Sequence, residues 1–177
     1  AGDLEVGNKL MTAINPIRYP ENGVSEENLR EMRRIKARME SERLPRGADV
    51  NMNTKLGRGG LSDVEWVVQL LQMQNGHKIK SLQNTSTLST LKQLEKENLI
   101  TTQDAASLKD SWILATEVRN AQMLAKAKAS DQIPTDINEI NAIAYVINKH
   151  SSSEFIEEYR KITRRARTVM ERLFYGE

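Results

Sequence analysis

The sequence predicts an all-α protein: an up-and-down helical bundle of about seven helices with one long glycine-containing loop at residues 44–60. Only nine glycines and four prolines occur among the 177 residues, so long segments run without a residue that breaks a helix. Aromatic residues make up 5% of the chain, which also disfavours a sheet. Apolar residues recur every three or four positions through most of the sequence, and this is the period of an amphipathic helix.

The first two helices are expected over residues 3–15 and 26–42. Pro16 is expected to end the first helix, because proline lacks the backbone N–H that continues the hydrogen-bond ladder. The second helix should begin after Ser25, whose hydroxyl is a good N-cap and is followed by two glutamates that favour the positive end of the helix dipole.

The third helix is expected over residues 62–74, directly after the loop. Valine, leucine, methionine and tryptophan cover most of its circumference, which places it at the centre of the bundle. The remaining periodic segments predict helices at residues 87–97, 102–128, 135–147 and 153–174. Gly176 then suits the position just beyond a helix end, where glycine is favoured.

Charge and composition exclude several classes of function. Lys and Arg number 26 against 24 Asp and Glu, for a net charge of +2, so no nucleic-acid-binding arm is expected. The chain has no cysteine and only two isolated histidines, so we expect no metal site. No apolar run reaches the roughly 18 residues of a membrane span, and we expect a cytoplasmic protein without membrane contact.

The segment KLGRGGLSDVEW at residues 55–66 is the most informative string. It is not a Walker A loop, because no Gly-Lys-Ser/Thr follows the second glycine. The acidic pair Asp63 and Glu65 imitates the metal-binding pair of nucleotidyltransferases, but residues two apart on a helix point in different directions and cannot share an ion. We therefore expect no catalytic residue here.

Two interpretations of this segment stay open. Ser62 and Glu65 fit a capping box at the start of the third helix, which makes the loop a structural elbow. Alternatively, glycines and cations beside a helix N-terminus suit an anion or a neighbouring domain, with Asp63 orienting Arg58 or a cation of that other domain. The candidate site residues at this interdomain or nucleotide-proximal loop are Lys55, Gly57, Arg58, Gly59, Gly60, Asp63 and Glu65.

Arginines gather on the second and last helices. They form either a solvated face or a docking surface for an acidic protein or for a nucleotide-carrying domain. No exposed aromatic residues alternate with them, which disfavours nucleic acid. The candidate docking residues are Arg160, Arg164, Arg165, Arg167, Arg33 and Arg34.

Residues 55–72 resemble the Gly-Gly-Leu-x-Asp-Ile-Glu-Phe motif of the glutamine synthetase adenylyltransferase family, and a related motif occurs in the PII uridylyltransferases. The resemblance extends to residues 14–20, 35–49, 84–88 and 164–176, which is nearly the whole chain. In that family each of two halves has a nucleotidyltransferase domain followed by a helical domain, and the ending of this chain resembles the C-terminus of the second half.

The resemblance implies that residues 1–177 are a single helical domain excised from the C-terminal part of a longer enzyme. That enzyme uses ATP and Mg²⁺ to attach AMP to a tyrosine of glutamine synthetase, and removes it by phosphorolysis. The partners it implies are glutamine synthetase, a PII-type signal protein and an upstream nucleotidyltransferase domain, with the fragment alone inactive. The alternatives are a non-enzymatic helical interaction domain and the equivalent domain of a uridylyltransferase.

Overall fold

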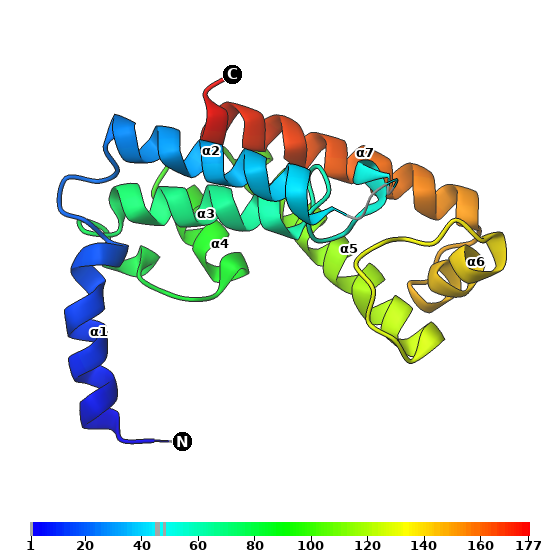
Figure 1. Cartoon of the computed structure of the whole chain (residues 1–177), viewed down its shortest axis with the longest axis horizontal. Coiled ribbons are helices and arrows are strands. Elements are labelled where there is room, and N and C mark those ends of the chain that lie inside the picture. The colour runs from blue at the N-terminus through cyan, green and yellow to red at the C-terminus, as the bar shows by residue number, and fades with distance from the viewer. Residues whose placement is uncertain (1, 45–46, 48) are drawn as a thin grey trace.

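The computed structural model describes residues 2–44, 47 and 49–177, and those residues form seven α-helices, three short helical turns and no sheet (Figure 1). The all-α prediction is confirmed. The α-helices are α1 (Leu4–Arg18), α2 (Glu26–Arg43), α3 (Leu61–Asn75), α4 (Thr87–Lys96), α5 (Thr102–Lys126), α6 (Ile137–Val146) and α7 (Ser152–Met170). The short turns are the 3₁₀ helices η1 (Val50–Met52) and η2 (Lys80–Leu82) and the π-helical turn η3 (Glu171–Tyr175).

Helices α2, α3 and α7 lie side by side, and α5 crosses beneath them to reach α6 (Figure 1). Helix α5 packs against α3, α4, α6 and α7. One core cluster joins α3, α4 and the start of α5 to the end of α7, around Val64 and Leu108. The second cluster joins the C-terminal half of α5 and the N-terminal half of α7 to α6, around Val118 and Phe155.

Helix α1 stands away from this bundle (Figure 1) and contains no buried residue. The prediction that Pro16 ends it is wrong, because the helix continues to Arg18. Proline removes the bond to the carbonyl four residues earlier, which belongs to Thr12. Thr12 is exposed, so water can satisfy that carbonyl. The helix ends where the Tyr19 N–H donates to the Asn15 carbonyl at 2.8 Å.

Other helix ends follow the sequence closely. Ser25 caps α2 by accepting from the backbone N–H of Asn28 at 3.2 Å. Gly176 closes the last turn with a φ of +80°, as the sequence predicts. Helix α6 begins at Ile137, two residues after the expected start at residue 135, because the carboxylate of Asp136 accepts the first backbone N–H groups.

Candidate functional site

The segment before α3 is an ordered loop tied to a distant part of the chain. We call residues 49–60 the glycine loop; residues 45, 46 and 48 of the predicted loop lie outside the described residues. The backbone N–H of Thr54 donates to the Asp131 carbonyl at 2.7 Å, and that of Ile133 donates to the Met52 carbonyl at 2.8 Å. These bonds fix the glycine loop against the connection between α5 and α6.

Gly59 makes a close approach to α7. Its φ is +71°, and a Cβ atom placed there would lie 1.9 Å from the carbonyl oxygen of Thr163. The side chain of Ser111 on α5 donates to the Gly59 carbonyl at 2.5 Å. Glycine is therefore required at this position by both the backbone conformation and the contact.

The start of α3 is capped by backbone carbonyls, so the predicted capping box of Ser62 and Glu65 is wrong. The N-cap residue is Gly60, and no side chain caps the helix. The N–H of Leu61 donates to the Thr54 carbonyl at 3.0 Å, and that of Ser62 donates to the Lys55 carbonyl at 2.9 Å. Backbone carbonyls of the folded loop therefore accept the first N–H groups of α3, a role that the sequence pattern had assigned to side chains.

Asp63 is the centre of a buried ionic cluster. Its side chain is fully buried, and one oxygen accepts from Lys36 of α2 at 2.6 Å. The other oxygen accepts from the Gly59 N–H at 2.7 Å and from Arg167 of α7 at 3.1 Å. The same Lys36 and Arg167 also pair with Glu40. We call Lys36, Glu40, Asp63 and Arg167 the ionic cluster.

Two predictions fail because of this cluster. Asp63 does not orient Arg58; it holds the glycine loop, α2 and α7 together. Arg167 is not part of an exposed docking face, since only 16% of its side chain is exposed. Burial alone would lower the pKa of Arg167, but its hydrogen bond to Glu171 and the charges of Asp63 and Glu40 raise the pKa overall. The guanidinium is therefore locked in its charged form.

The remaining docking candidates do not form one surface. Arg33 of α2 is half-buried and donates to the Phe174 carbonyl at 2.7 Å, while the neighbouring Arg34 is exposed and pairs with Glu31. Arg165 is exposed on α7. Only Arg160 and Arg164 share a cavity with the glycine loop.

That cavity, of about 410 Å³, brings together two groups of residues that the sequence separates by a hundred positions. We call it the arginine cleft. Arg58 enters it from the glycine loop, and Arg160 and Arg164 enter it from α7, with Arg167 at its inner wall. Arg58, Arg160 and Arg164 are exposed. Its other lining residues are Asp49, Asn51, Thr163, Thr168 and Glu171.

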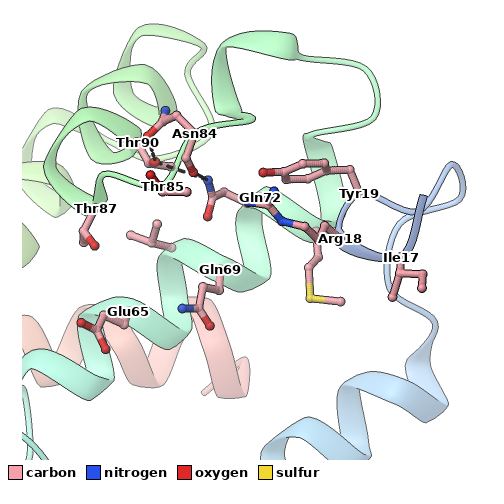
Figure 2. A pocket seen from close by; sticks show the side chains of 12 residues that line it. Ile17, Arg18, Tyr19, Glu65, Gln69, Gln72, Asn84, Thr85, Thr87 and Thr90 are labelled. Carbon is pink, nitrogen blue, oxygen red and sulfur yellow. Dashed lines mark hydrogen bonds between the residues drawn. The ribbon is translucent and has the colours of Figure 1, made fainter. Parts of the chain in front are cut away.

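A second cavity, of about 470 Å³, lies where the end of α1 meets α3 and the start of α4 (Figure 2). Gln72 anchors its wall by donating to the carbonyls of Leu82 and Asn84 at 2.6 and 2.9 Å. Asn84 in turn accepts from the Thr90 hydroxyl at 3.1 Å. Tyr19 and Glu65 complete the wall, and we call this cavity the polar pocket.

Glu65 points away from the ionic cluster because it lies two residues beyond Asp63 on the same helix. Burial raises the pKa of Glu65, although the positive charges of Lys55 and Arg119 act in the opposite direction. The polar pocket was missed by the sequence analysis, yet a signal for it existed. Residues 14–20, 55–72 and 84–88, which carry the family resemblance, each contribute to its wall.

Within residues 2–44, 47 and 49–177, no three His, Asp or Glu side chains are grouped so that they could hold a metal ion. None of the helices in that part of the chain is long and apolar enough to cross a membrane. Of the cavities among the described residues, the arginine cleft and the polar pocket contain residues that the sequence singled out.

The sequence of the chain matches a known family. The pattern that defines the family described as GlnD PII-uridylyltransferase matches residues 27–174, and the chain belongs to that family. It is 53% identical over 177 residues to the bifunctional glutamine synthetase adenylyltransferase/adenylyl-removing enzyme of Nocardia farcinica. It is 50% identical over 178 residues to the enzyme of that name from Streptomyces coelicolor, and 46% over 176 to that from Mycobacterium tuberculosis.

These alignments cover 98% or 99% of this chain, and the chain spans 18% of the length of each of these relatives. The resemblance found in the sequence is therefore confirmed along the whole chain. The relatives' shared name favours the adenylyltransferase alternative over the uridylyltransferase alternative and over an unrelated interaction domain.

Proposed function

We propose that this chain is the helical companion domain of an enzyme that attaches AMP to glutamine synthetase and removes it. The observation that carries this proposal is the identity of 46–53% over nearly the whole chain with enzymes of that name. In the proposed reaction, a tyrosine oxygen of glutamine synthetase bonds to the α-phosphorus of ATP, pyrophosphate leaves, and the phenolic proton is lost.

The chemistry is assigned to another part of the longer protein. Among the described residues, no three His, Asp or Glu side chains are grouped so that they could hold a metal ion, and ATP-dependent transfer uses Mg²⁺ to bind the phosphates. The proposed roles of this domain are to orient the nucleotide-carrying domain and to help bind glutamine synthetase or a PII-type signal protein, in the cytoplasm.

The residues proposed to face the nucleotide-carrying domain are those of the 55–65 segment that remain accessible. Lys55 and Arg58 are exposed, and Glu65 is half-buried at the polar pocket. Gly57, Gly59, Gly60 and Asp63 are buried, so their part is to hold that edge in place. This division replaces the single seven-residue site that the sequence predicted.

The test uses the full-length enzyme that contains this chain, with ATP, Mg²⁺ and glutamine synthetase. The Arg58→Gln variant should lower AMP transfer at least tenfold, which is about 1.4 kcal/mol of barrier, with a normal melting temperature. Arg34→Gln is the matched control, because Arg34 is also exposed but lies on α2 away from both cavities. The 177-residue chain alone should transfer no AMP.

Two results would contradict the proposal. Turnover above background by the 177-residue chain alone would place the catalytic groups in this domain. Full activity of the Arg58→Gln enzyme would mean that the glycine loop has only a structural role and does not act on the nucleotide-carrying domain. The family assignment would be unaffected.

A further inference from the structure

We propose that the arginine cleft is a binding site for a small molecule that carries linked phosphate groups, such as pyrophosphate or the polyphosphate of a nucleotide. This inference deepens the role proposed above for Arg58 and extends it to Arg160 and Arg164. It rests on three features of the cleft: its unpaired charge, its fixed geometry and its size.

The first feature is unpaired positive charge. Among the described residues, no carboxylate lies within 4.0 Å of the guanidinium groups of Arg58, Arg160 or Arg164. These guanidinium groups also donate no hydrogen bond to a described residue. Two carboxylates also line the cleft, but both are engaged. Asp49 accepts from the Asn51 N–H at 2.9 Å, and Glu171 accepts from Arg167 at 2.8 Å. With Arg167, four arginines line the cleft against these two carboxylates, and the resulting excess of positive charge favours a bound anion.

The second feature is that the backbone carrying these cations is ordered before any ligand arrives. Arg58 stands between Gly57, whose N–H donates to the Asn53 carbonyl at 3.1 Å, and Gly59, which is hydrogen-bonded to Asp63 and Ser111. Arg160 and Arg164 are four residues apart on α7, and so lie on one face of the helix. Because the backbone at these residues is already ordered, binding a ligand costs the entropy of the side chains but not that of the backbone.

The third feature selects the class of anion. Guanidinium groups bind phosphate through two parallel hydrogen bonds, a geometry that matches their planar fork. The volume of about 410 Å³ lies within the roughly 300–1,000 Å³ typical of small-molecule sites. Three cations on two sides of one cavity suit a compact ligand with several charges, whereas an extended acidic peptide spreads its charges along its length.

The experiment is calorimetric titration of the 177-residue chain with sodium pyrophosphate, with ionic strength held constant by sodium chloride. We expect saturable binding to one site. Arg58→Gln and Arg164→Gln should each weaken it about tenfold or more, equivalent to 1.4 kcal/mol. Arg165→Gln is the matched control: Arg165 is the next residue on α7 and is exposed, but does not line the cleft. It should change the affinity less than about twofold.

Parallel titrations with inorganic phosphate, with ATP in the absence of Mg²⁺ and with hexaglutamate identify the ligand. Tighter binding of ATP than of pyrophosphate would support a nucleotide, and the reverse would support free pyrophosphate. The proposal is overturned by an absence of saturable pyrophosphate binding, by equal weakening in Arg165→Gln, or by binding of hexaglutamate alone. The titrations involve neither glutamine synthetase nor catalysis, so their failure is distinguishable from failure of the proposed function.

Discussion

The ionic cluster and the arginine cleft contain similar residues from neighbouring parts of the sequence, but their environments are opposite. Asp63 and Lys36 are at most 1% exposed and are fully paired. Arg58, five residues before Asp63, is exposed and unpaired among the described residues. Buried charges of this kind hold elements in register, because losing one partner leaves an uncompensated charge. An exposed charge keeps its hydration, so leaving it without an ion-pair partner costs little free energy. Such a charge remains available for a ligand.

The two regions are mechanically connected through two residues. Asp63 binds the Gly59 N–H, and Gly59 positions the adjacent Arg58. Arg167 is a member of the ionic cluster and also forms the inner wall of the cleft. We therefore expect the ionic cluster to set the geometry of the arginine cleft, and substitutions in each region can separate the two roles.

The largest effect is expected from Asp63→Ala. This change leaves the buried Lys36 with Glu40 as its one ion-pair partner among the described residues, and Arg167 with Glu40 and Glu171. The free energy of unfolding, measured by urea denaturation, should therefore fall by about 3–5 kcal/mol. Glu31→Ala is the control, because it also deletes the carboxylate of an ion pair, but Arg34 and Glu31 are 79% and 54% exposed. It should cost less than about 1 kcal/mol. Equal losses in the two variants would show that the cluster is no stronger than a surface pair.

Gly59→Ala should have the next largest effect. The left-handed backbone alone costs about 1–2 kcal/mol with a side chain, and the contact with the Thr163 carbonyl adds to this, because backbone must move. Gly23→Ala separates the two contributions, since Gly23 has a φ of +67° but its nearest neighbour would be at 3.4 Å. Thermal melting should show a larger loss for Gly59→Ala. A loss of melting temperature no greater than that of Gly23→Ala would mean that the backbone of α7 moves away from the new side chain at little cost in free energy.

The fold was predictable because helical periods are local. Each expected helix is present, and the errors lie at helix ends, where backbone from elsewhere intervenes. Ser62 and Glu65 fit a capping box by spacing, yet the carbonyls of Thr54 and Lys55 took the same N–H groups. The exposed α1 shows a second limit. Apolar residues recur along α1 at the helical period, but a period does not reveal whether anything packs against that face; Leu10 is 58% exposed.

The candidate site was predicted in part. The sequence identified Arg58 and Arg164 as candidates, but assigned them to separate sites, because no local pattern links residues more than a hundred positions apart. The partners of Asp63 were missed for the same reason: Lys36 lies 27 residues before it and Arg167 lies 104 residues after it. Pairing over such separations is decided by how α2, α3 and α7 pack.

The finest comparison concerns two acids whose pKa values move in opposite directions. For Asp104, burial alone would raise the pKa, but hydrogen bonds from Arg172 and Thr101 lower it below its ordinary value of 3.8. Ionised Asp104 therefore stabilises the fold at every pH above that value, and the contribution is lost as the pH falls through the lowered pKa. Asp104→Asn should cost about 1 kcal/mol near pH 7, with the difference from the parent shrinking below about pH 4.

Glu65→Gln should show the opposite sign and a smaller size. Because the pKa of Glu65 is raised above 4.5 in the folded chain, its ionised form opposes folding. That cost is complete above the raised pKa and disappears as the pH falls to 4.5 and below. The variant should therefore be more stable than the parent near pH 7, by about 0.5 kcal/mol or less, and equal to it near pH 4. Melting temperatures of both proteins from pH 3.5 to 8, at about one-unit steps around the ordinary pKa, provide the measurement. A variant that is less stable than the parent at pH 7 would mean that the attraction of Lys55 and Arg119 exceeds the cost of burying the Glu65 carboxylate. In that case the carboxylate stabilises the loop and is not a free group at the polar pocket.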